Sequence, residues 1–188
     1  KNDIIRATFK EYKIKRPIEI TTLADIPSGT GLGSSGSFGV GLIHALVPDM
    51  DKKNLAMWSS FIQIDALKYP IGFQDQLVAA YGNINTYEVS KNGLVKVMPL
   101  KINYKQFQQK LVMFFTGIKR DTNQVLKGST TEGLEQIQML AHDMKENLEY
   151  GRFEAFGYLM GRHWEYKKKR GEITDRKINR YYNLGLKL

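Results

Sequence analysis

The chain has 188 residues, of which 42% are hydrophobic and 25% charged, and this balance predicts a soluble globular protein with a sizeable core. It contains no cysteine, which excludes a disulfide framework and a thiolate metal site. No stretch approaches the roughly 20 uninterrupted apolar residues that a membrane span needs, and the first residues are too charged for a signal peptide. We therefore expect a cytoplasmic protein that has no membrane partner.

The formal net charge is +9, and lysine and arginine cluster in "KIKR" (13–16) and "YKKKRG" (166–171). Such charge suits a nucleic-acid-binding module, but it equally suits an enzyme that acts on phosphates, because positive surface concentrates anions. A single cluster is as compatible with a solvated face as with a binding site. Since net charge alone supports nucleic acid, we expect no nucleic-acid partner.

The first half of the chain shows both kinds of periodicity. Residues 18–23, "IEITTL", are rich in β-branched residues and alternate weakly, which predicts a strand. Apolar residues then recur at helical spacing, which predicts one helix over 35–46 and a second over 51–68.

The second half begins with strand signals and ends with helical ones. The stretches 83–89 and 94–100 are joined by "SKNG", which predicts a hairpin. The apolar run "KLVMFFTGI" (110–118) predicts a buried strand. Helical periodicity follows over 131–151, over 152–169 and from about Thr174 onward. Strands followed by helices indicate an α+β architecture.

A glycine-rich loop separates the predicted strand from the first predicted helix. Gly29, Gly31 and Gly33 alternate with other residues, and serines occupy the first turn of the helix. This order presents unpaired backbone N–H groups and the positive end of a helix dipole at one point, as a phosphate cradle requires. The spacing excludes a Walker A loop and the dinucleotide fingerprint. The structural alternative is a glycine-rich helix that packs closely on a sheet.

Two stretches resemble a known family. The segment "PSGTGLGSSGS" (27–37) closely resembles the second motif of the GHMP kinases, usually Pro-x-x-x-Gly-Leu-Gly-Ser-Ser-Ala, with Gly36 where alanine is usual. The segment "PIGFQDQLVAAYGNINTYEV" (70–89) resembles the sugar-kinase branch, and most of all the heptose 7-phosphate kinases. Residues 114–126 and 161–169 are similar to further segments of that subfamily.

The resemblance implies a two-domain α+β fold. Residues 1–107 would form a ribosomal-protein-like, ATP-binding domain with a left-handed βαβ feature, without the first segment that relatives have. Residues 108–188 would form a ferredoxin-like domain without the glycine-rich third motif.

The same resemblance implies an activity. It is transfer of the γ-phosphate of ATP, with Mg²⁺, to the anomeric hydroxyl of a heptose 7-phosphate. The enzyme would be a monomer or homodimer whose partner is a small sugar phosphate. Two alternatives stay open: another GHMP kinase of the galactokinase, fucokinase or mevalonate kinase type, or a catalytically weakened protein that binds a nucleotide or sugar phosphate.

Individual roles are carried over by position. Asp75 matches the catalytic aspartate and would accept the proton of the attacking hydroxyl, while Ser35 matches the serine that binds Mg²⁺. Arg120 and Gln74 are the predicted substrate contacts. The residues expected to bind ATP are Gly29, Gly31, Leu32, Gly33, Ser34, Ser35, Gly36 and Ser37.

One position departs from the family pattern. In many relatives a glutamate about 12 residues before the catalytic aspartate helps to bind Mg²⁺, but here the position holds Gln63. A neutral amide is a poorer ligand than a carboxylate for this cation. Asp65 could replace it only with a different helix register, since residues i and i+2 do not share a face.

Overall fold

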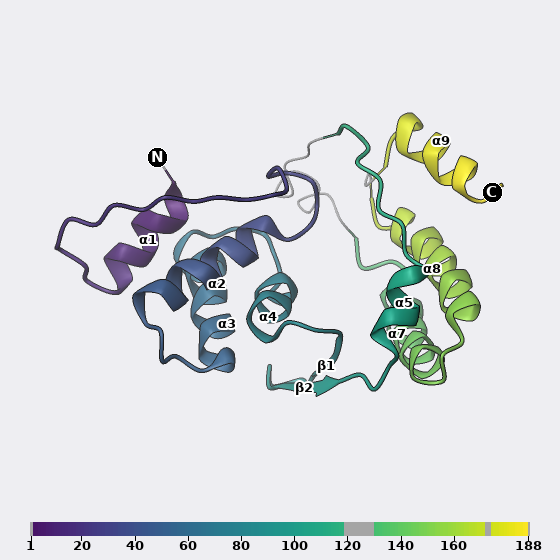
Figure 1. Ribbon diagram of the computed structural model, residues 1–188, viewed down its shortest axis with the longest axis horizontal. Coiled ribbons are helices and arrows are strands. Elements are labelled where there is room, and N and C mark those ends of the chain that lie inside the picture. The colour runs from purple at the N-terminus through teal and green to yellow at the C-terminus, as the bar shows by residue number, and fades with distance from the viewer. Residues whose placement is uncertain (1, 119–129, 172–173, 188) are drawn as a thin grey trace. The chain divides into compact units, whose positions relative to one another are not determined.

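The structure is a computed structural model that describes residues 2–118, 130–171 and 174–187. These residues form helices and one small two-stranded sheet, so the described chain is of the α+β type (Figure 1). No helix in the described ranges is long and apolar enough to cross a membrane.

The chain divides into two compact units, and the first contains residues 2–83 together with Ile118. The predicted helix over 35–46 is confirmed, and the one over 51–68 is confirmed as a helix that becomes a π-helix at Phe61. The elements of this unit are α1 (Asp3–Glu11), α2 (Ser34–Leu46), α3 (Lys52–Ser60), the π-helix η1 (Phe61–Ala66) and α4 (Gln74–Tyr81).

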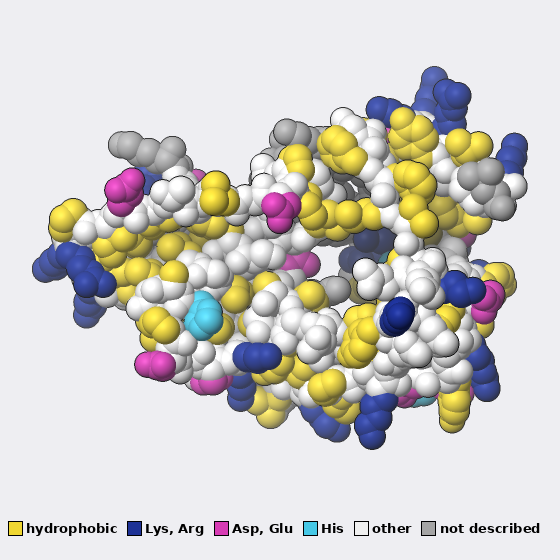
Figure 2. Space-filling model, in the orientation of Figure 1, with side chains coloured by type: hydrophobic (Ala, Val, Ile, Leu, Met, Phe, Trp, Pro, Cys, Tyr) yellow, Lys and Arg dark blue, Asp and Glu magenta, His cyan; other side chains and the backbone are white. Residues whose placement is uncertain are grey.

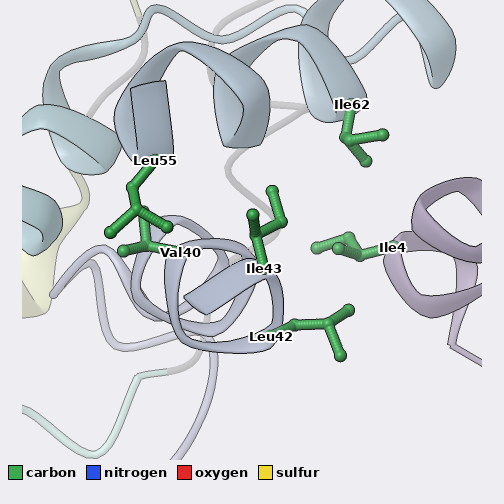
Figure 3. Packing of buried hydrophobic residues seen from close by; sticks show 6 residues of the cluster. All are labelled: Ile4, Val40, Leu42, Ile43, Leu55 and Ile62. Carbon is green, nitrogen blue, oxygen red and sulfur yellow. The ribbon is translucent and has the colours of Figure 1, made fainter. Parts of the chain in front are cut away.

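A compact apolar core holds these helices together. It forms where α1, α3 and η1 pack around α2, and Ile43 of α2 and Ile62 of η1 are completely buried in it (Figure 3). The buried side chains of this cluster are Ile4, Val40, Leu42, Ile43, Leu55 and Ile62. Burial of a side chain of this size contributes about 1.5–3 kcal/mol, so the core fixes α2, whose first turn follows the glycine loop.

The predicted strand over 18–23 is wrong. These residues adopt no regular secondary structure and belong to the long irregular segment between α1 and α2 (Figure 1). A strand needs a hydrogen-bonding neighbour, and in the described ranges the two strands of the small sheet pair with each other. The β-branched composition of the segment therefore expresses a local preference that finds no partner.

The second unit begins with a hairpin and continues with helices. The hairpin prediction is confirmed: β1 (Asn85–Val89) and β2 (Val95–Pro99) pair antiparallel, with Asn85 opposite Pro99 and Val89 opposite Val95. The three late helices that the periodicity predicts are also present. The helices of this unit are α5 (Tyr104–Gln109), α7 (Leu134–Glu149), α8 (Phe153–Lys168) and α9 (Arg176–Gly185).

A separate aromatic core stabilises the second unit. Leu100, Phe107 and Leu148 are buried together. The ring of Phe107 lies 5.7 Å from that of Phe153 and 5.5 Å from that of Phe156, measured between centroids. These contacts join α5 to α7 and to the start of α8 through side chains far apart in the sequence.

The predicted buried strand over 110–118 is also wrong. Lys110 caps the end of α5, and residues 111–116 have no regular structure. The five apolar side chains from Leu111 to Phe115 are exposed, with Phe114 at 81%. Apolar composition alone predicted burial, but no described strand or helix covers this run.

Candidate phosphate-binding loop and the aspartate beside it

The glycine loop has the backbone that its sequence predicts. Gly29, Gly31 and Gly33 have φ angles of +76°, +80° and +68°, in the left-handed region where a side chain is strained. Within the loop, the Thr30 hydroxyl donates a hydrogen bond to the carbonyl oxygen of Pro27 at 3.1 Å. The alternating glycines thus allow a tightly turned backbone that leads directly into α2.

The N-terminus of α2 has no side-chain cap from its own N-cap residue. Gly33 is the N-cap residue, no side chain accepts a hydrogen bond from the first turn, and that turn contains no acidic residue. The first helical hydrogen bond runs from Ser37 N–H to Gly33 O at 3.0 Å. The preceding N–H groups have no partner within the helix, and they lie at its positive end.

A pocket of about 660 Å³ opens beside this helix end. The hydroxyl side chains of Ser34, Ser35 and Ser37 line it together with apolar Leu32 and Phe38. This size falls within the range of small-molecule sites, roughly 300–1,000 Å³. Polar hydroxyl groups beside an uncapped helix N-terminus suit phosphates, and the apolar part suits a flatter, less polar portion of the same ligand.

Asp75 lies against the loop although it is remote in the sequence. A methyl group at Gly33 would lie 3.2 Å from Oδ2 of Asp75, and one at Gly36 would lie 2.8 Å from Cβ of Asp75. Asp75 is in the first turn of α4, which packs on α2. The structure therefore brings together the two parts of the predicted site, and glycines at both contacts make this close approach possible.

The pocket and Asp75 occupy different sides of the start of α2. The residues that line the pocket include Ser34, Ser35 and Ser37, whereas Gly33 and Gly36 face Asp75. Asp75 itself does not line the pocket, and its residue is exposed to solvent. A ligand whose phosphates cross the helix N-terminus would thus reach from the pocket to the carboxylate.

Gln63 is remote from the open pocket. Its side chain is completely buried, and its Nε2 donates to the carbonyl oxygen of Ser59 at 3.3 Å and to Ser59 Oγ at 3.2 Å. Gln63 does not line the pocket, and its buried Oε1 has no hydrogen-bond partner within the described part of the chain. The position that resembles a metal ligand in the sequence is therefore part of the helix packing.

The described residues offer many contacts for a polyphosphate but few ligands for Mg²⁺. The uncapped first turn of α2 and its hydroxyl groups match phosphate oxygens. Hydroxyl oxygens suit a hard cation, and the Ser35 hydroxyl, which lines the pocket, would supply one. Within the described residues no group of three or more histidine, aspartate and glutamate side chains could hold a metal ion.

The other predicted contacts have different outcomes. Gln74 begins α4 and is exposed next to Asp75, and its contact with a substrate stays a prediction. Arg120 lies outside the described residues. The sequence did not point to Asn2 and Asp25, which also line the pocket. Only the tertiary fold brings Asn2, at the start of α1, to the loop, whereas Asp25 lies two residues before Pro27 and was not singled out.

Basic side chains are spread widely over the molecule. Figure 2 shows lysine and arginine on many parts of the visible face of both units. In the second unit several cations lie on tyrosine rings, such as Lys169 on Tyr166 at 5.4 Å and Lys177 on Tyr181 at 5.7 Å. Some of the positive charge is thus engaged in contacts within the chain.

Residues 2–83 match the sequence profile of the GHMP kinases N terminal domain. The chain is 30% identical over 190 residues to the D-glycero-alpha-D-manno-heptose 7-phosphate kinase of Campylobacter jejuni, an alignment that covers 92% of the chain and 56% of that protein. It is 26% identical over 169 residues to the L-fucokinase/L-fucose-1-P guanylyltransferase of Bacteroides fragilis, covering 80% of the chain and 18% of that protein.

A solved structure shows the same fold. The crystal structure of a D-glycero-D-manno-heptose 1-phosphate kinase from Bacteroides thetaiotaomicron matches with a TM-score of 0.67 at 26% identity, covering 89% of the chain and 54% of that protein. The chain thus spans about half the length of the two heptose phosphate kinases that it resembles. The profile match over residues 2–83 and the similarity to these kinases agree with the resemblance read from the two motifs.

Proposed function

We propose that the protein is an ATP-dependent sugar kinase that transfers the γ-phosphate to the anomeric hydroxyl of a heptose 7-phosphate. The observation that carries this proposal is the contact of Asp75 with Gly33 and Gly36, at the start of a helix whose N-terminus is uncapped. The similarity to a heptose 7-phosphate kinase and a heptose 1-phosphate kinase supports this class of substrate.

Each part of the site has a role in such a transfer. Phosphoryl transfer depends on positioning and charge stabilisation more than on covalent chemistry. The N–H groups at the start of α2 would hold the phosphate oxygens, with hydroxyl contacts from Ser34 and Ser37. The Asp75 carboxylate would accept the proton of the sugar hydroxyl on its side of the helix end. Bound Mg²⁺, held by Ser35, would supply neutralisation of the phosphate charge.

The wider organisation of the protein is part of the same proposal. We infer a two-domain fold with a division near residues 107 and 108, in which the first domain has the left-handed βαβ feature and the second is ferredoxin-like. We also infer a cytoplasmic enzyme, monomeric or homodimeric, that has neither a nucleic acid nor a membrane as partner.

A second candidate function is binding without efficient transfer. The burial of Gln63 favours it, because this side chain adds no second metal ligand to the hydroxyl of Ser35. A protein with fewer metal ligands would still bind a nucleotide through the α2 N-terminus. Similarity to an L-fucokinase leaves a different sugar as a further possibility within the kinase class.

The two functions are separated by measuring ATP consumption with a panel of sugar phosphates and with free sugars. We expect turnover with a heptose 7-phosphate and a loss of about 100-fold or more in the Asp75→Asn variant. Nucleotide binding should survive, because Asp75 does not line the pocket. Asp65→Asn is the matched control, since Asp65 is an exposed aspartate on η1.

Unchanged turnover in Asp75→Asn would exclude the catalytic role. Nucleotide binding with no turnover on any sugar of the panel would instead favour the second candidate. Turnover with another sugar would keep the kinase and correct the substrate.

A further inference from the structure

A layer of polar side chains is buried next to the α2 helix, away from the open pocket. Ser59 in α3, Gln63 in η1 and Gln76 in α4 are each completely buried. Glutamine is seldom fully buried in a protein, and two such residues are present within one small helical unit. The helices that carry them all pack on α2 or on one another.

Glycines on successive turns of α2 lie in close contact with residues of α3, η1 and α4. A methyl group at Gly39 would lie 2.5 Å from Ser59 Oγ and 2.8 Å from Gln63 Nε2. A methyl group at Gly36 would lie 3.0 Å from the Asp75 carbonyl carbon and 3.1 Å from the Gln76 backbone nitrogen. The same face of α2 therefore contacts Gln63 on one turn and the Asp75–Gln76 pair on the turn before.

The accessibility of Gln63 decides whether its side chain can bind a metal ion or only pack between helices. Its Oε1 is buried and has no hydrogen-bond partner among the described residues, and Gln63 does not line the solvent-open pocket, so an ion there does not contact it in this arrangement. Its Nε2 donates to the Ser59 carbonyl oxygen. An ionised carboxylate at this position would lack that donor and would bring a negative charge against a carbonyl oxygen in a buried site.

We propose that Gln63 is a positioning residue and not a metal ligand. Anchored on Ser59 and packed against Gly39, its amide fixes the distance between α2 and α3. Because α4 packs on both of these helices, the amide thereby keeps Asp75 against Gly33. Gln76, the buried neighbour of Asp75, lies against the preceding turn of α2 through its backbone nitrogen near Gly36. This inference rests on the proposed function for the role of Asp75, but the buried placement of Gln63 stands independently of it.

The test compares Gln63→Glu, Gln63→Met and the control Asp65→Asn in the protein. We measure thermal unfolding at several pH values, ADP affinity with and without Mg²⁺, and ATP turnover. We expect Gln63→Glu to unfold at a lower temperature than Gln63→Met at neutral pH, and to recover as the pH falls, because a protonated carboxyl is neutral and can donate to Ser59. Both variants should keep the parent's Mg²⁺ dependence of ADP affinity.

The positioning role is measured separately from stability. We expect Gln63→Met to lower kcat by about tenfold, with little change in KM for ATP. It should also shift the carboxyl carbon-13 resonance of Asp75, whereas Asp65→Asn leaves both unchanged. An unchanged kcat and an unchanged Asp75 resonance in a folded Gln63→Met variant would overturn the positioning role.

A metal-ligand role predicts the opposite set of results. Gln63→Glu would then tighten ADP binding in a Mg²⁺-dependent way without a loss in unfolding temperature, and this outcome would overturn the proposal. If the parent protein binds no nucleotide and transfers no phosphate, the proposed function fails. The Asp75 resonance and the unfolding temperatures would still support or refute the placement and role of Gln63.

Discussion

Two glycines of α2 that lie two positions apart have opposite surroundings. Gly39 is buried, and a methyl group there would collide with Ser59 and Gln63. Gly41 is exposed and has nothing within 4 Å of an added methyl group. Helix propensity disfavours both glycines equally. A difference between the stability effects of replacing each of them by alanine therefore reports on the packing of the polar layer against α2.

Substitution of each glycine by alanine should therefore change stability in opposite directions. We expect Gly39→Ala to lower the free energy of unfolding by about 1–3 kcal/mol, because an added methyl group overpacks the contact. We expect Gly41→Ala to raise it by about 0.5–1 kcal/mol. Urea unfolding of both variants checks the pair, and equal effects would contradict the packing described for Gly39.

The residue types of the site were predictable from the sequence, but their contacts were not. The motif around Gly33 and the segment around Asp75 were each recognised by resemblance. Their proximity depends on how α4 packs against α2, which no local spacing encodes. The burial of Gln63 was equally hidden, since a glutamine next to apolar residues reads as a polar position on a helix surface.

At the level of elements, α3 shows how a local signal fixes a helix start. Asp51 is the N-cap residue, and its Oδ1 accepts a hydrogen bond from the Asn54 N–H at 3.0 Å. This backbone hydrogen bond holds the pKa of Asp51 below its ordinary value. A carboxyl group with a lowered pKa in the folded state stabilises the fold above its unfolded-state pKa, and this stabilisation is lost as the pH falls through the folded-state value.

The Asp51→Ala variant should hence be less stable than the parent protein at neutral pH. The difference should shrink as the pH falls below about 4, the ordinary pKa of an aspartate, and vanish only below the lower folded-state pKa of Asp51. Asp51→Ser serves as a control, because a hydroxyl group caps the same N–H without a titratable charge. Thermal unfolding between pH 3 and 7 measures the effect, and a pH-independent difference would rule out the charged cap as its source.

Helices were predicted more accurately than strands for a physical reason. A helix satisfies its backbone hydrogen bonds internally, so the spacing of its apolar residues suffices to locate it. A strand depends on a neighbour. The hairpin supplies its own through a short turn, whereas residues 18–23 and 110–118 have strand-like composition without a described partner.

At the scale of the whole molecule, the two units have separate cores. The first is aliphatic and centred on Ile43, and the second is aromatic and centred on Phe107. Single-sequence patterns could not predict this partition, because it depends on contacts between residues distant in the chain. A substitution in one core should therefore change the stability of its own unit separately from that of the other.

Phe107→Ala should destabilise the second unit by about 3 kcal/mol, since it removes a buried ring in contact with Phe153 and Phe156. Hydrogen exchange followed by mass spectrometry should show faster exchange in α5, α7 and the start of α8, with little change in α2. ADP with Mg²⁺ should instead slow exchange around Gly33. Equal acceleration in both units would indicate that they unfold together.

The exposed run from Leu111 to Phe115 affects the tendency of the protein to self-associate in solution. Five consecutive exposed apolar residues of high β propensity can pair with the same run in another molecule. The net charge of +9 opposes such encounters by mutual repulsion. Since salt screens that repulsion, concentrated solutions should scatter more light as ionic strength rises.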